Sequence, residues 1–454
     1  SQSIDSMSRW LVGSSSSSTC GRDASTKASS RRRRCPADSS ATGGLEKVLA
    51  ARDYHEFRSL VHAMKGSSAS MGTDRLTRTC GAFGSLSDAE LRNLEAHHFD
   101  RAQFARLRER YRSGELTPES NRIDATIRGP APDDILEIPA EGSELFREAV
   151  QLGVTAIDGG EVAHVVLNGG MATRFGGVVK GTVEVSDGVS FLGLKLRDAA
   201  RWNGAVPVLL MNSFATTADT DRHLRENDYF GFDPERVWQF EQNIAVRLQR
   251  DGELFRENGG SPSFYGPGHG DLPSALNRGV LQRFCESGGR YVFMSNVDNV
   301  LATVDPLIVG LHVLASMRGI EMTIEAAPRY EGDKGGMPAR VGGRLQVVEA
   351  FRLPEAFDTS RIDVFNTNTF IFDAASLERD FDLTWFVVEK QVAGEPVIQF
   401  ERLAGELSAF LECQFLRVSR EGASSRFLPV KTPEDLESSR AYLRTTMMDR
   451  GVLR

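Results

Sequence analysis

The chain has 454 residues, of which 40% are hydrophobic and 26% charged, so it is long enough for a large domain together with one or two smaller ones. Its formal net charge of -8 leaves no global positive field to hold a nucleic-acid backbone or an anionic membrane, so any bound phosphate must meet local cations. The five cysteines are scattered without metal-ligand spacing and no apolar run is long enough to span a membrane, which argues against a disulfide framework, a zinc site and a membrane segment and favours a cytoplasmic protein.

Composition divides the chain into three parts. Residues 1–44 are Ser-rich, carry an arginine run at 31–34 and hold few core-forming side chains, so we predict a disordered tail. A transit peptide is the alternative interpretation, although acidic residues interrupt the segment and no amphipathic helix is evident. Residues 45–134 are predicted to form a helical lead-in, because apolar residues recur at helical spacing from Leu86 to Tyr111. Residues 135–454 are predicted to form the main domain.

Within the main domain, short apolar runs alternate with amphipathic segments, as in α/β proteins. Several runs are apolar throughout, which is typical of strands buried on both faces of a helix-covered, mostly parallel sheet. Ligands of such sheets bind beyond the carboxyl ends of the strands, so the loops after these runs are the expected functional positions. The predicted strands are residues 164–168, 206–212, 291–295, 322–326 and 370–372.

A glycine-rich loop, LNGGMATRFGGVVKG, covers residues 167–181 directly after the first predicted strand. Its glycines permit close backbone approach, and Arg174 and Lys180 bring positive charge, which together describe a phosphate cradle. The spacing is neither GxxxxGK[ST] nor GxGxxG, so ordinary P-loop ATPase and dehydrogenase functions lose their main support. Taken by itself, the loop is equally compatible with a plain structural turn.

Two polar segments follow later strands. In YGPGHGD, residues 265–271, a rigid Pro-Gly turn presents His269 between two glycines, a pattern that a surface turn also produces. In YVFMSNVDNVLATV, residues 291–304, Asp298 stands between Asn296 and Asn299 after an apolar strand. A carboxylate there, beside a phosphate loop, suits Mg²⁺, which prefers one or two carboxylates plus phosphates and water. The alternative is that Asp298 caps the next helix.

Three downstream segments add polar groups. Glu349 ends a predicted strand, Asn366 and Asn368 stand at strand spacing and hence on one face, and Lys431 follows a Pro-stiffened run. Acid and amide groups suit sugar hydroxyls, whereas a lysine suits phosphate. Taken singly, each of these residues is more often a surface or capping residue than a ligand.

In their order and separations, these segments resemble the UTP-glucose-1-phosphate uridylyltransferase family, the UDP-glucose pyrophosphorylases, over residues 162–436. The resemblance implies a Rossmann-like mixed α/β sheet, mostly parallel and of the sugar-nucleotidyltransferase type, which makes residues 135–454 the catalytic domain. The C-terminal β-helix domain of eukaryotic members is expected to be absent, because the chain ends soon after Lys431. The segments that carry the resemblance are LNGG, VLLMNSF, TADT, GPGHGD, SNVDN, LATVD, KGG, GRLQVVEAFRLP, FNTNTFIF, VIQFE and SRFLPVKT.

The resemblance also implies an enzyme that joins UTP to glucose 1-phosphate, releases pyrophosphate and uses Mg²⁺. Catalytic roles are implied for Arg174, Lys180 and Lys431, and Asp298 matches the Mg²⁺ carboxylate. Contacts to the substrates are implied for Gly169, Gly170, Met211, Gln242, Gly268, His269, Asn296, Glu349, Asn366 and Asn368.

The glycine-rich loop departs from the family pattern. Ala172 replaces the usual Gly, Phe175 replaces Met, and one residue is missing before Lys180, which leaves the register of that lysine open. Arg174 resembles the arginine of bacterial GxGTR loops and of UDP-N-acetylhexosamine pyrophosphorylases. Galactose 1-phosphate or an N-acetylhexosamine 1-phosphate as the sugar substrate, and an inactive sugar-nucleotide-binding relative, are therefore the alternatives. Without the β-helix through which relatives associate, the chain is expected to be a monomer.

Overall fold

The computed structural model describes residues 86–257, 260–333 and 335–453. These residues all belong to one compact unit, residues 79–454. The tail predicted over residues 1–44, residues 45–85 of the predicted lead-in and Lys334 of the KGG segment lie outside the described residues. Within the described ranges, no helix combines the length and the apolar character needed to cross a membrane.

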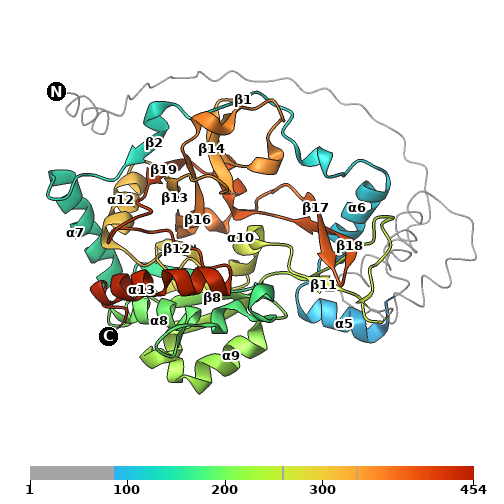
Figure 1. Cartoon of the computed structure of the whole chain (residues 1–454), viewed down its shortest axis with the longest axis horizontal. Coiled ribbons are helices and arrows are strands. Elements are labelled where there is room, and N and C mark those ends of the chain that lie inside the picture. The colour runs from blue at the N-terminus through green and yellow to red at the C-terminus, as the bar shows by residue number, and fades with distance from the viewer. Residues whose placement is uncertain (1–85, 258–259, 334, 454) are drawn as a thin grey trace, which may run out of the picture. The chain divides into compact units, whose positions relative to one another are not determined.

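An eight-stranded sheet forms the centre of this unit (Figure 1), and its strand order is β2-β19-β13-β16-β12-β3-β8-β9. Five neighbouring pairs are parallel, and β16 alone runs antiparallel to both of its neighbours in this sheet. The prediction of a mixed, mostly parallel sheet is confirmed, and all five predicted strands belong to it. The strands are β2 (Ile135–Glu137), β3 (Val162–Leu167), β8 (Val208–Asn212), β9 (Val237–Glu241), β12 (Tyr291–Asn296), β13 (Met322–Pro328), β16 (Val364–Asp373) and β19 (Cys413–Arg417).

The direction of β16 brings its first residues to the functional edge of the sheet. Tyr291, at the start of β12, pairs with Asp373 at the end of β16, and Met294 pairs with Phe370. Because the two strands are antiparallel, the segment before Phe370 lies beside the carboxyl end of β12. The FNTN residues, at the start of β16, therefore reach the ligand edge of the sheet.

Alternate residues of the buried strands point to opposite faces of the sheet, so both faces are apolar. Helices cover each of them. Val162 and Val166 of β3 belong to one core and Ala163 and Val165 to the other. The first core is shared with α7 (Glu144–Asp158), α8 (Phe191–Ala200), α9 (Thr217–Glu226), α12 (Pro306–Ser316) and α13 (Pro433–Asp449), and the second with α10 (Leu272–Leu276) and α11 (Val280–Glu286).

Two glycines set the distance between α7 and α12. A Cβ at Gly153 would overlap the carbonyl oxygen of Pro306, and a Cβ at Gly310 would overlap that of Ala149. The two helices therefore pack backbone against backbone. Because α12 follows the turn that contains Asp298, this contact holds the segment after β12 against the first core.

The smaller elements surround the carboxyl edge and one side of the sheet. In Figure 1, the helices α5 (Asp88–Ala96) and α6 (Arg101–Arg112) lie beside the ribbon β17 (Phe386–Val392) and β18 (Glu395–Glu401). Arg108 attaches α6 to the loop at residues 252–253, because its Nε donates to the Gly252 carbonyl at 2.5 Å and its Nη2 to Glu253 at 2.7 Å. The other strands are β1 (Ile127–Arg128), β4 (Met171–Ala172), β5 (Val178–Val179), β6 (Glu184–Ser186), β7 (Val189–Ser190), β10 (Ala245–Val246), β11 (Phe264–Tyr265), β14 (Gly336–Val341) and β15 (Arg344–Glu349).

The chain's last described element is α13, and the described residues contain no β-helix, in line with the fold expected from the sequence. Helix α13 begins with a capping box, in which the Thr432 side chain accepts from Asp435 N and the Asp435 side chain accepts from Thr432 N. This cap also fixes the neighbouring Lys431, whose backbone N donates to Asp435 Oδ2 at 2.9 Å.

Candidate functional site

The glycine-rich loop folds as a small hairpin at the end of β3. Its strands β4 and β5 pair with each other, and Gly176 and Gly177 between them have φ of 86° and 80°, a region that favours glycine. Arg174 is exposed in this turn. Lys180 N donates to the Gly170 carbonyl at 3.2 Å, which closes the hairpin and returns the chain to the edge of the sheet.

Lys180 and Asp298 meet at this edge. The Lys180 ammonium donates to Asp298 Oδ2, and the two side chains are only 18% and 15% exposed. Asp298 lies in the turn after β12, and β12 is the parallel neighbour of β3, so the two carboxyl ends come together. The structure thus joins the predicted phosphate-binding lysine to the predicted metal ligand, despite the residue that the loop lacks.

Lys431 reaches the same place through backbone pairing. Asn299 forms an antiparallel bridge with Pro429, and Val430 N donates to the Asp298 carbonyl oxygen at 3.0 Å. The Lys431 side chain itself is exposed. Its ammonium can therefore meet a ligand that enters from solvent beside Asp298.

The three predicted asparagines form a chain of hydrogen bonds. Asn368 Nδ2 donates to Asn296 Oδ1 at 2.9 Å, and Asn368 N donates to Asn366 Oδ1 at 2.9 Å. The prediction of plain strand alternation is wrong at Asn368, whose φ is 56°, because β16 bulges there: Ile324 pairs with Phe370, but Ala326 pairs with Asn366. The bulge turns the amide of Asn368 toward β12.

Glu349 ends β15 beside Gly336, where a Cβ would lie 2.7 Å from Glu349 Oε1. Burial raises the pKa of this carboxyl to about 7, and the nearby Arg352 opposes the shift only in part. A half-buried acid with so perturbed a pKa is a candidate for a functional group. In its ionised form it accepts hydrogen bonds only, which suits sugar hydroxyls.

His269 is fixed by the backbone of a distant segment. Its Nδ1 accepts from Ala404 N at 2.9 Å, and burial lowers the pKa of the ring to about 4. The imidazole is therefore neutral near pH 7 and carries its hydrogen on Nε2, which leaves a donor for a ligand. The preceding Gly268 has φ of 104°, and a Cβ there would lie 2.5 Å from the Arg402 carbonyl oxygen.

The predicted uridine side of the site centres on Gln242. Its backbone N donates to the Asn212 carbonyl at 2.9 Å, and its side chain packs between the glycine-rich loop and the YGPGHGD loop. A Cβ at Gly169 would lie 2.5 Å from Gln242 Nε2, and a Cβ at Gly266 would overlap the same amide. Met211 is 2% exposed and contributes its side chain to the core under the sheet.

Inspection of the sequence missed Lys195, which lies in the middle of α8 and is 1% exposed. Burial lowers the pKa of this lysine to about 7, against the raising effect of Asp198 and Asp298. Its sequence context, FLGLKLRDAA, gives no sign of burial, since a lysine in an amphipathic helix is ordinarily on the solvent side. The side chain lies behind the turn that carries Asp298.

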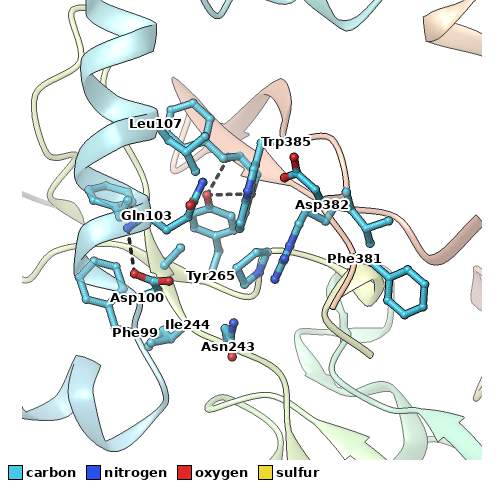
Figure 2. Close-up of a pocket in the computed structure, with 16 residues that line it drawn as sticks. Phe99, Asp100, Gln103, Leu107, Asn243, Ile244, Tyr265, Phe381, Asp382 and Trp385 are labelled. Atoms are coloured by element: carbon cyan, nitrogen blue, oxygen red, sulfur yellow. Dashed lines mark hydrogen bonds between the residues drawn. The ribbon is translucent and has the colours of Figure 1, made fainter. Parts of the chain in front are cut away.

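A cavity of about 220 Å³ adjoins the YGPGHGD loop (Figure 2). Figure 2 shows Gln103 and Leu107 of α6 facing Tyr265 and Trp385 across this cavity. None of the predicted site residues lines it. Its lining includes Asn243, which follows Gln242 in the chain, and Arg402, whose carbonyl packs against Gly268, so the cavity adjoins predicted site residues without containing them. We therefore assign the chemistry to the cluster around Asp298.

The donor groups at this edge suit one magnesium ion shared with phosphates. Across the part of the chain that the structure describes, no group of three or more His, Cys, Asp and Glu side chains is placed to hold a metal. Asp298 offers one carboxylate, which already accepts a cationic partner in Lys180. Mg²⁺ needs no more than one or two carboxylates when phosphate and water oxygens complete its coordination.

Comparison with known families gives two matches. A family model described as UTP–glucose-1-phosphate uridylyltransferase matches residues 103–449. A model described as an Hpt domain matches residues 41–113, most of which lie outside the described residues. The first match covers every predicted site residue.

Similar individual proteins agree with the first match. The UTP–glucose-1-phosphate uridylyltransferase of Musa acuminata is 31% identical over 371 residues, which cover 77% of this chain and 75% of that protein. A UDP-glucose pyrophosphorylase variant from Leishmania major, solved in complex with UDP-glucose, is similar with a TM-score of 0.58 at 25% identity over 78% of this chain and 79% of its own. The UDP-N-acetylglucosamine pyrophosphorylase of Trypanosoma brucei, solved with an inhibitor, has a TM-score of 0.62 at 20% identity over 90% and 85% of the two chains, a likeness of fold alone.

Proposed function

Because this chain belongs to the UTP–glucose-1-phosphate uridylyltransferase family, we propose that it transfers the uridylyl group of UTP to glucose 1-phosphate in a reversible, Mg²⁺-dependent reaction. The products are UDP-glucose and pyrophosphate. The single observation that supports this most is the meeting of Lys180 and Asp298 where β3 and β12 end, with Lys431 beside them. Such a cluster provides positive charge and a metal ligand at one point of the sheet edge.

The chemistry requires alignment and charge neutralisation. A phosphate oxygen of the sugar substrate attacks the α-phosphorus of UTP, a new P–O bond forms, and the bond to the bridging oxygen breaks as pyrophosphate leaves. The attacking oxygen is already anionic, so no general base is needed. What the protein supplies is in-line positioning of two polyanions and stabilisation of the charge on the leaving group. Lys180, Lys431 and the exposed Arg174 are the cations at hand.

Mg²⁺ would be held by Asp298 together with phosphate oxygens. When bound, the ion supplies further neutralisation of the triphosphate charge. In the structure, Lys180 donates to the Asp298 carboxylate, and Val430 N donates to the backbone carbonyl oxygen of the same residue. The carboxylate is therefore oriented before any ligand arrives.

Glucose 1-phosphate is proposed as the sugar substrate for two reasons. The relatives from Musa acuminata and Hordeum vulgare, 31% and 30% identical, carry the name UTP–glucose-1-phosphate uridylyltransferase, and the Leishmania major structure was solved with UDP-glucose. In this chain, Glu349 and the amides of Asn296 and Asn368 suit the hydroxyls of a hexose ring. The T. brucei UDP-N-acetylglucosamine pyrophosphorylase, similar in fold alone, keeps the N-acetylhexosamine as the second candidate.

A direct assay tests the proposal. Pyrophosphate release from UTP would be measured with glucose 1-phosphate, galactose 1-phosphate and N-acetylglucosamine 1-phosphate, each with Mg²⁺ and with chelator. We expect the highest kcat/KM for glucose 1-phosphate, no turnover with chelator, and none with Asp298→Ala. A higher kcat/KM for either other sugar phosphate would replace the proposed substrate, and no release with any of them would overturn the transferase activity itself.

A further inference from the structure

Lys195 uses every donor of its buried ammonium. Its Nζ donates to the Asn299 carbonyl at 2.8 Å, to the Ala302 carbonyl at 2.7 Å and to Ser295 Oγ at 3.2 Å. An ammonium has three N–H groups, so none is left over. All three acceptors lie at the end of β12 or in the turn that follows it, on either side of Asp298.

Two more charged residues hold the same segment: Asp198 of α8 and Arg201, which caps the end of that helix. Asp198 Oδ2 accepts from Val304 N at 2.7 Å, and Arg201 Nη2 donates to the Val304 carbonyl at 3.3 Å. Lys195, Asp198 and Arg201 are three residues apart, so they share one face of the helix. The backbone from Asn299 to Val304 is thus clamped along α8 by side chains rather than by a strand.

The clamped segment is also the support of Lys431. Asn299 Oδ1 accepts from Leu428 N at 3.0 Å, and Asn299 Nδ2 donates to the Arg426 carbonyl at 3.2 Å. Asn299 therefore connects the Asp298 turn to the segment that ends in Lys431. A shift of the Asn299 backbone would displace both groups together.

The same helix contacts the loop of Lys180. A Cβ at Gly181 would lie 2.7 Å from Leu192 Cγ, so the loop rests directly on the first turn of α8. One helix consequently bears the Lys180 loop at its start and the Asp298 turn in its middle. The relative position of these two groups depends on how firmly the turn is held to the helix.

We propose that Lys195 is a positioning residue for uridylyl transfer, which acts through the Asn299 and Ala302 carbonyls to hold Asp298 and Lys431 in register with Lys180. The inference rests on the proposed function of that cluster. An apolar side chain at position 195 takes its donor away from the buried Ala302 carbonyl, whereas the Asn299 carbonyl still accepts from Ala302 N at 3.2 Å and Ser295 Oγ still lies 2.9 Å from His164 Nε2. Burying a carbonyl without its donor is costly, so the turn rearranges to satisfy it. The loss then appears in the transition state, where placement within a fraction of an ångström matters.

The test compares Lys195→Met with a control that also loses a buried cation. Arg108→Met removes the guanidinium that binds Gly252 and Glu253, far from the Asp298 turn in the sequence and outside the proposed machinery. Both variants are expected to lower Tm. Lys195→Met is expected to lower kcat by roughly tenfold or more with KM for both substrates within about threefold, whereas Arg108→Met keeps kcat within about twofold.

Hydrogen exchange without substrates gives a second readout. Amides of residues 297–305 should exchange faster in Lys195→Met than in the parent, and Arg108→Met should leave them unchanged. The inference is overturned if Lys195→Met exchanges residues 297–305 at the parent's rate and keeps kcat within twofold of the parent. A parent protein without transferase activity overturns the proposed function instead, while the exchange result still tests the clamp.

Should Lys195→Met fail to fold, Ser295→Ala takes its place, because it removes one acceptor of the ammonium at little change in volume. We expect kcat to fall by roughly threefold with KM unchanged and exchange of residues 297–305 to rise. Unchanged kcat and exchange in a folded Ser295→Ala protein would count against the inference.

Discussion

Lys180 and Asp298 are separated by 118 positions in the chain, yet the ammonium of one donates to the carboxylate of the other at the carboxyl edge of the sheet. The pair joins the glycine-rich hairpin to the turn after β12. Because a metal on Asp298 and the Lys180 ammonium compete for the same oxygens, ligand binding is expected to exchange one cation for the other. This exchange leads to the first prediction.

Lys180→Met should bind Mn²⁺ several-fold more tightly than the parent in the absence of nucleotide, since the competing ammonium is gone. The measurement is a titration of free Mn²⁺ by electron paramagnetic resonance, with Asp298→Asn as the control that removes the site. The same Lys180 variant should show a raised KM for UTP, because a cation that holds the phosphates is lost. Equal Mn²⁺ affinity in Lys180→Met and the parent would mean that the ion pair does not oppose metal binding.

Lys431→Ala should lower kcat by roughly 10²-fold, in line with the few kcal/mol that one preorganised charge-stabilising group contributes. Its backbone is fixed next to Asp298 while its side chain remains exposed, so the loss should fall on turnover rather than on folding. Lys390→Ala is the matched control, because Lys390 is another solvent-accessible lysine, paired with Glu401 on the β17–β18 ribbon. A kcat within a few-fold of the parent would remove Lys431 from the reacting phosphates.

Glu349 predicts a pH dependence of stability. Burial raises the pKa of its carboxyl to about 7 from the ordinary 4.5, so the folded protein holds the proton more tightly than the unfolded chain. The group's contribution to stability is full below about pH 4.5 and is lost as pH rises through 7. The Glu349→Gln variant has no carboxyl to ionise, so it does not lose this stability as pH rises. The unfolding free energy of the variant minus that of the parent should therefore increase by about 1–3 kcal/mol between pH 5 and pH 8. Urea unfolding at both pH values checks this, and a pH-independent difference contradicts it.

The ion pair between Glu325 and Arg426 is buried, with side chains 1% and 5% exposed and contacts of 2.6–2.9 Å. Removing one partner leaves the other buried charge without its main partner, although Arg426 keeps Asp305 at 3.4 Å and the Thr303 carbonyl at 3.1 Å. Glu325→Ala and Arg426→Met should therefore each cost about 3–5 kcal/mol of unfolding free energy. The double substitution should cost clearly less than the sum of the two. Chemical denaturation of the four proteins measures the coupling, and additive losses would show that the pair contributes nothing as a pair.

The sequence predicted the strands of the sheet and the edge at which function gathers. Runs such as those around Val165 and Phe293 are apolar on both faces, and this pattern identifies buried strands without any knowledge of their neighbours. Strand direction is a different matter. That β16 runs against β12 and β13 depends on pairing between segments far apart in the chain, which hydrophobic periodicity does not report.

The site was predictable to a similar degree. Polar residues after buried strands, such as Asp298, stand out because they interrupt an apolar pattern. The bulge at Asn368 does not, because its φ of 56° results from the register that β13 imposes on β16. Lys195 does not either, since its burial is stabilised by carbonyl oxygens up to 107 positions away in the sequence.

The side-chain amide of Gln242 packs between Gly169 of the glycine-rich loop and Gly266 of the YGPGHGD loop. Both loops therefore contact the same amide. Neither glycine has a side chain, and the absence of a Cβ at both positions leaves the space that the Gln242 amide occupies. A methyl added at either position pushes the amide toward the opposite loop, so the spacing of the loops and the direction in which Gln242 presents its oxygen and nitrogen change together. Under the proposed function, base preference would therefore depend on the width of the gap between the two loops, which Gly169 and Gly266 set.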